Sequence, residues 1–104
     1  MVVARLTYAK LRPDADLDEA RKVWDESIGP AAIAQKGCVG AFMTVNEEKT
    51  GGLAITLWET KEDGEAGVAS GYYQEQVNRF GPFLAVAPTH EYQTVNSDII
   101  FLKK

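Results

Sequence analysis

Apolar and polar positions follow a regular period in six segments of the chain. Four segments are rich in β-branched and other apolar residues and end at Pro, Gly or polar turns, which is typical of strands. These predicted strands cover residues 2–11, 38–46, 53–59 and 91–102. Between the first and second strand, and again between the third and fourth, apolar residues recur at helical spacing, which predicts two amphipathic helices. Residues 83–89 are apolar without either period, and no element is predicted there.

Both predicted helices begin at a capping residue. Asp16 and Thr60 each stand three positions before an acidic residue, a pattern that resembles the capping box. The first helix then meets Gly29 and Pro30. Because Pro cannot donate to the helical ladder, we expect the helix to break or kink there, with a short second segment over residues 30–36.

The second predicted helix carries glycines at positions i, i+3 and i+7, namely Gly64, Gly67 and Gly71. Each costs about 1 kcal/mol relative to Ala in a helix interior, so a compensating feature is expected. One interpretation is that a ligand or another backbone approaches this face closely. The other interpretation, which we favour at this point, is a frayed or broken helix that begins near Ser70.

The order of the elements is β-α-β-β-α-β, which predicts an α+β ferredoxin-like fold with an antiparallel sheet and both helices on one face. Apolar neighbours nevertheless point to opposite faces of the strands, as Phe42 and Met43 do in the second strand and Leu57 and Trp58 in the third. One domain over residues 1–104 has no further layer to cover the second apolar face. We therefore expect a homodimer in which another copy of the sheet covers it.

Composition narrows the range of functions. The 104 residues include 11 Lys and Arg against 15 Asp and Glu, a formal net charge of −4, and no basic cluster, which argues against a nucleic-acid partner. No apolar run has the length of a membrane span and the first residues do not resemble a signal peptide, so we expect a cytoplasmic protein with no membrane partner. With one Cys (Cys38) and one His (His90), no disulfide and no metal site are expected. Cys38 is interpreted as a small buried hydrophobe.

The run Leu57-Trp58-Glu59-Thr60, which closes the third strand and opens the second helix, carries a family resemblance. Together with the order of elements, it resembles the dimeric α+β barrel superfamily and, within it, the antibiotic biosynthesis monooxygenase (ABM-like) domains. The resemblance implies a homodimeric barrel with a pocket between sheet and helices in each subunit. It also implies oxidation of a small aromatic or quinol-type substrate without any cofactor, or the degradation of haem found in other relatives.

Residue by residue, the resemblance transfers little of the family chemistry. The strand Trp of the cofactor-free monooxygenases is matched by Trp58, but Ala54, Gly64 and Asn78 stand where those enzymes have Asn, Tyr and Arg, with Arg79 one position further. The helix positions of the Trp and His of the haem-degrading relatives hold Gly67 and Val77, and near the position of their strand Asn the first strand offers Thr7. Two functions therefore stay open: a cofactor-independent monooxygenase, or a non-catalytic module of the same fold that binds a small ligand or another partner.

Five residues are the candidates for a site: His90, Trp58, Tyr73, Tyr72 and Arg79. His90 is the side chain with an ordinary pKa near neutrality, so it is the candidate general base, although a solvated position at a strand start is its plainer interpretation. Trp58 is expected to pack in the core or to wall the pocket. Tyr72 and Tyr73 lie about 100° apart on the helix, so at most one points fully at the sheet, and Tyr73 is the better candidate to bind a small apolar or aromatic molecule.

Arg5 shares one face of the first predicted strand with Thr7. If that face lies inside the dimer barrel, the guanidinium needs a partner such as Asp98 or an anion in the pocket, because a buried unpaired charge is very costly.

Overall fold

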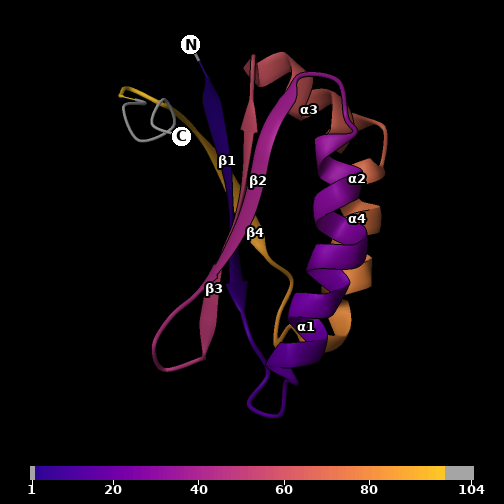
Figure 1. The fold of residues 1–104 in the computed structure, drawn as a ribbon, viewed down its shortest axis with the longest axis vertical. Coiled ribbons are helices and arrows are strands. Elements are labelled where there is room, and N and C mark those ends of the chain that lie inside the picture. Colours follow the sequence, from indigo (N-terminus) through magenta and orange to yellow (C-terminus); the bar gives the residue numbers. More distant parts are fainter. Residues whose placement is uncertain (1, 98–104) are drawn as a thin grey trace.

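A four-stranded antiparallel sheet with helices on one face forms the molecule (Figure 1). The structure is a computed structural model, and it describes residues 2–97. The strands are β1 (Val3–Lys10), β2 (Cys38–Val45), β3 (Gly51–Trp58) and β4 (Thr89–Thr94). Their order in the sheet is β2-β3-β1-β4, so the predicted ferredoxin-like α+β fold is confirmed. β4 begins two residues before the predicted strand, and residues 98–102 of that prediction, with Asp98, lie outside the described residues.

The register of the sheet decides which side chains face the helices. Val3 of β1 lies opposite Trp58 on β3 and opposite Thr94 on β4. Because successive side chains of a strand point to opposite faces, Arg5 and Thr7 share the face of Trp58, toward the helices. Of the two sides open to Arg5 and Thr7, the helix-facing side is the one they occupy, so the condition of a position inside a dimer barrel does not apply to them.

The first helical region is one continuous run, against the predicted break at Pro30 (Figure 1). It consists of α1 (Leu17–Val23), the π-helical turn η1 (Trp24–Ile28) and α2 (Gly29–Ile33), with Asp16 capping the start. The amide of Gly29 donates to the carbonyl of Trp24, five residues back. This wider turn leads into Pro30 near the start of α2. An N–H at that position would have no partner within α2, so its absence costs no hydrogen bond and the chain continues as a helix.

The second helical region is broken into two helices. The glycine pattern favoured a frayed or broken helix that begins near Ser70, but the structure places the start and the break differently. α3 (Lys61–Ala69) contains Gly64 and Gly67, and α4 (Tyr72–Phe80) follows after Gly71. Gly71 has a φ of 88°, a left-handed conformation that is easy for glycine and ends α3. The helix therefore begins at Lys61, not near Ser70, and a 3-10 turn, η2 (Gly81–Phe83), follows α4.

No described helix covers the opposite face of the sheet (Figure 1). On this face Tyr8 is 41% and Phe42 is 40% exposed, and the hydroxyl of Tyr8 donates to the carboxylate of Glu91. Among the described residues, no helix is long and apolar enough to cross a bilayer.

Candidate functional site

A cavity of about 640 Å³ lies between the sheet and the helices, within the usual range for small-molecule sites. Its walls come from the helix-facing side of β1, β2 and β3, from the first helical region and from α4. Most of the lining is apolar or aromatic, with Met43, Ala54, Trp24, Val77 and Phe80 among the contributors. The cavity therefore suits a compact apolar molecule, and its few polar groups decide how such a molecule would be oriented.

Arg5 is the buried cation of this cavity, and its side chain is only 4% exposed. Its Nη1 donates to the backbone carbonyl of Gly64 over 3.1 Å. The guanidinium carbon also lies 5.1 Å from the ring centre of Trp58 and 4.7 Å from that of Tyr73. The ion pairs formed within residues 2–97 involve other arginines, all on the surface. Two aromatic rings and one carbonyl thus hold a positive charge beside the cavity.

Trp58 supports Arg5 and is not one of the side chains that line the cavity. It is 0% exposed, and its Nε1 donates to Thr56 Oγ1 over 2.8 Å, so its polar group is satisfied. The backbone of Gly64 lies against its ring, where an added Cβ would approach Trp58 to 3.4 Å and Tyr92 to 3.0 Å. The close approach on the glycine face is therefore made by two aromatic side chains of the chain itself.

Tyr72 and Tyr73 both line the cavity, although they are neighbours on α4. The hydroxyl of Tyr73 forms a hydrogen bond of 3.3 Å with Thr7 Oγ1. The hydroxyl of Tyr72 is buried and has no hydrogen-bond partner among residues 2–97. Burial raises the pKa of Tyr72, and the positive charge of Arg5 acts in the opposite direction. Of the two hydroxyl groups, that of Tyr73 is therefore hydrogen-bonded within the described chain, and that of Tyr72 is available to a ligand.

His90 stands at the edge of this cluster and is exposed on β4, directly opposite Thr7. Its ring centre lies 4.7 Å from that of Tyr73 and 5.9 Å from that of Tyr92. Burial of one side of the ring, followed by the charge of Arg5, lowers the pKa of His90 below its usual 6.5. The imidazole is then neutral at pH 7 and able to accept a proton. It is not among the side chains that line the cavity, and its catalytic role stays a prediction.

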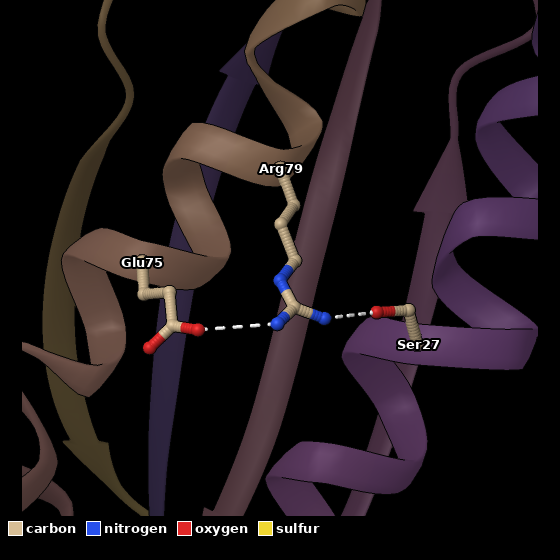
Figure 2. A network of polar contacts seen from close by, with 3 residues as sticks. All are labelled: Ser27, Glu75 and Arg79. Atoms are coloured by element: carbon tan, nitrogen blue, oxygen red, sulfur yellow. Dashed lines mark hydrogen bonds and ion pairs between the residues drawn. The ribbon is translucent and has the colours of Figure 1, made fainter.

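Arg79 connects two helices on the outer side of α4 (Figure 2). It donates to Ser27 Oγ on η1 and pairs with Glu75 on α4 at 3.1 Å. Its side chain does not line the cavity, so the contact with Ser27 instead fixes α4 against the first helical region.

Sequence reasoning missed Gln76, which is buried in the cavity wall and whose Oε1 has no partner in the described part of the chain. The spacing could have predicted this position, because Gln76 follows Tyr73 by three residues and therefore lies on the same face of the helix. Trp24 of η1 also lines the cavity. Cys38 is half-buried and its Sγ donates to Gly40, while burial raises the pKa of the thiol.

Comparisons with known proteins identify this fold. No family model and no curated protein matches the sequence. The monooxygenase ActVA-Orf6 of Streptomyces coelicolor, solved in complex with the ligand nanaomycin D, superposes with a TM-score of 0.76 at 13% identity over 93% of this chain and 89% of that one. The chain has the same fold as this monooxygenase. SnoaB, a cofactor-independent oxygenase from Streptomyces nogalater, shares that fold with a TM-score of 0.74 at 12% identity, over 94% of this chain and 96% of that one. Rv0793 from Mycobacterium tuberculosis gives 0.73 at 15% identity, over 95% and 99%.

Proposed function

We propose that the chain is a cofactor-independent monooxygenase that oxidises a small aromatic or quinol-type compound in the cavity between sheet and helices. The observation that carries the proposal is the apolar cavity of about 640 Å³ with the buried guanidinium of Arg5 beside it. Two structural neighbours, ActVA-Orf6 and SnoaB, are oxygenases, which supports this reaction class over others possible on the same fold.

The substrate supplies the electrons in such a reaction. An anthrone illustrates the balance: its ring CH₂ and O₂ become a ring carbonyl and water. Removal of one CH₂ proton gives an enolate, which transfers an electron to O₂ and then combines with the reduced oxygen to form a peroxide at that carbon. Loss of the second proton and cleavage of the O–O bond leave the carbonyl and release water. The protein has to remove a proton and stabilise the resulting anion.

The described side chains divide these tasks in the proposal. His90 is the general base in this proposal. It does not line the cavity itself, but its ring centre lies 4.7 Å from that of Tyr73, which does, and its lowered pKa keeps it neutral at pH 7. Tyr72 and Tyr73 contact the ring of the substrate from α4. Trp58 acts as a positioning residue through its contact with Arg5, and Arg79 holds α4 in place through Ser27.

Oxygen uptake with an anthrone as substrate tests the proposal. The wild-type protein should consume O₂ above the rate without protein, and His90→Ala should lower the excess by about a hundredfold, the contribution typical of a general base. Gln93→Ala, an exposed change on the same strand, is the matched control and should leave the rate unchanged. Equal rates with and without protein across a panel of anthrones and quinols would refute the enzymatic proposal for these compounds.

A second function is favoured by the residues at two family positions. Ala54 leaves an unreactive methyl group in the cavity wall where the related monooxygenases have Asn, and Gly64 has no space for the Tyr that they carry. A non-catalytic module that binds a planar ligand in the same cavity fits these replacements. Saturable binding of an aromatic compound without oxygen uptake would support this alternative.

We also propose that two copies of the chain pair through the uncovered face of the sheet. Tyr8 and Phe42 expose apolar area there, and covering such a face with its own copy is a common solution for a symmetric dimer. Sedimentation at micromolar concentration should give twice the chain mass of 11.4 kDa. A monomer at that concentration would contradict the pairing.

A further inference from the structure

We infer that the part of the cavity lined by Arg5 and Tyr72 is an anion subsite, which binds an ionised oxygen carried by a planar aromatic ligand. The inference rests on the proposed function only in taking this cavity as the ligand site. It requires no catalytic step and holds equally for a binding module.

The first observation is the state of Arg5. A guanidinium has five N–H donors, and the contacts of Arg5 within residues 2–97 include one hydrogen bond, to Gly64, and no carboxylate. Arg5 is 4% exposed, and a buried charge with no opposite charge beside it, as among these described residues, is costly to the folded chain. An anion brought by a ligand would offset that cost, so the ligand and the cation would stabilise each other.

The second observation is that the cation is held before any ligand arrives. Trp58 and Tyr73 contact the guanidinium, and the bond to Gly64 further restricts it. Trp58 is in turn fixed by its bond to Thr56. A donor group that is already ordered loses little conformational entropy on binding, so its charge contributes more fully to affinity.

The third observation is a second donor on the same cavity. The hydroxyl of Tyr72 is buried without a partner among the described residues, and it feels the charge of Arg5. Unpaired buried polar atoms are rare in folded proteins, and those that persist call for an explanation such as ligand binding. Gln76, one turn further along α4, leaves another polar atom unpaired in the same wall.

The other charges that line the cavity do not compete with Arg5 for this role. Arg21 and Asp25 pair with each other at 3.4 Å and are largely exposed, so their charges are both neutralised and screened by solvent. Asp18 and Lys49 are also exposed. Within residues 2–97, the buried charge without an opposite charge beside it is that of Arg5, and the surrounding apolar wall favours a flat hydrocarbon body attached to the anionic oxygen.

A matched pair of probes tests the subsite. 2-Naphthoate and 2-naphthamide have the same ring and nearly the same shape, but only the first is an anion at pH 7. Their affinities for the full chain, measured by titration calorimetry, should differ by about tenfold or more in favour of the naphthoate. Equal affinities within a factor of two would exclude a carboxylate as the anion of the subsite.

Three variants locate the effect. Arg5→Met should abolish the preference for naphthoate while naphthamide still binds, and Tyr72→Phe should reduce the preference severalfold. Arg12→Met removes an exposed cation that does not line the cavity, so it is the matched control and should keep the wild-type ratio. If Arg5→Met does not fold, Tyr72→Phe carries the test alone. A ratio unchanged in Tyr72→Phe would then overturn the assignment of that hydroxyl to the subsite.

A phenol probe separates the two sources of an anionic oxygen. 4-Nitrophenol ionises with a change in visible absorbance, and its pKa should fall on binding to wild type but not to Arg5→Met. A fall in that pKa without naphthoate preference identifies a phenolate or enolate subsite, and the reverse result identifies a carboxylate subsite. Failure of both probes overturns the inference. Oxygen uptake with an anthrone is a separate measurement, so failure of the subsite and failure of the monooxygenase proposal are distinguishable.

Discussion

Variants of three tyrosines can show which buried hydroxyl groups form hydrogen bonds within the folded chain and which do not. Tyr73 shares its hydroxyl with Thr7, whereas the hydroxyls of Tyr72 and Tyr92 are buried without a partner within residues 2–97. Tyr72 lines the cavity and Tyr92 does not. Replacing each by Phe removes one oxygen and keeps the ring, so the three variants differ only in what that oxygen does.

The expected changes in the free energy of unfolding have opposite signs. A buried hydroxyl without a partner costs about 1–3 kcal/mol, and a hydrogen bond between neutral groups contributes a net stabilisation of about 0.5–1.5 kcal/mol. Tyr72→Phe and Tyr92→Phe should therefore each raise the free energy of unfolding by about 1 kcal/mol, and Tyr73→Phe should lower it by about 1 kcal/mol. For a domain of this size, 1 kcal/mol moves the midpoint of thermal unfolding by about 4 °C.

Urea denaturation followed by circular dichroism checks these values, at a fixed protein concentration because a dimer would make the midpoint depend on concentration. Adding 2-naphthoate separates the two stabilised variants. It should raise the midpoint of wild type and of Tyr92→Phe, but raise that of Tyr72→Phe much less. If Tyr72→Phe is destabilised as much as Tyr73→Phe, its hydroxyl has a structural partner, and the reasoning is refuted.

Three further predictions follow from the same structure. The single imidazole, His90, should titrate by NMR with a pKa below 6.5, so the stability it contributes is present above pH 6.5 and is lost as the pH falls through the folded value. Arg5→Met should raise that pKa, and an unchanged value would place Arg5 too far away to act. Gly67→Ala should raise the free energy of unfolding, measured by urea denaturation, by about 0.5–1 kcal/mol, because the added Cβ would only touch the ring of Tyr72 at 3.4 Å. Gly71→Ala should lower it, because Gly71 has a φ of 88°. Equal effects of the two changes would contradict this reasoning. Phe42→Lys should leave the circular dichroism spectrum unchanged but give a monomer in sedimentation, and a persistent dimer would place the contact elsewhere.

Local patterns predicted the elements well because they depend on nearby residues. Thr60 caps α3 by accepting from the amide of Asp63 over 3.1 Å, as its spacing indicated. The predicted strands over residues 38–46 and 53–59 correspond to β2 and β3, which pair with each other in the structure. The π-turn before Pro30 was missed, since its wider hydrogen bond has no composition of its own.

The site was predicted less well because it depends on pairing between distant strands. Arg5 was identified as a buried charge that needs a partner, but its face was set by the register of β1 with β3 and β4. That register placed Arg5 over Trp58, which is fully buried and supports the cation. His90 was selected for its pKa near neutrality and Arg79 for its place next to a family position. Neither property reveals that both residues lie outside the cavity lining.

The position of β1 between β3 and β4 has a consequence for the order of events during synthesis. β1 precedes both neighbours in the sequence, and it pairs with residues near position 58 and near position 94. A nascent chain leaving the ribosome therefore holds its central strand unpaired until most of the sequence has emerged, with contacts that close slowly because they are far apart along the chain. During that interval Arg5 remains hydrated and both edges of β1 are open to other chains. When β3 and β4 pair with β1, the two open edges of β1 become hydrogen-bonded, and the same step buries the guanidinium of Arg5 away from water.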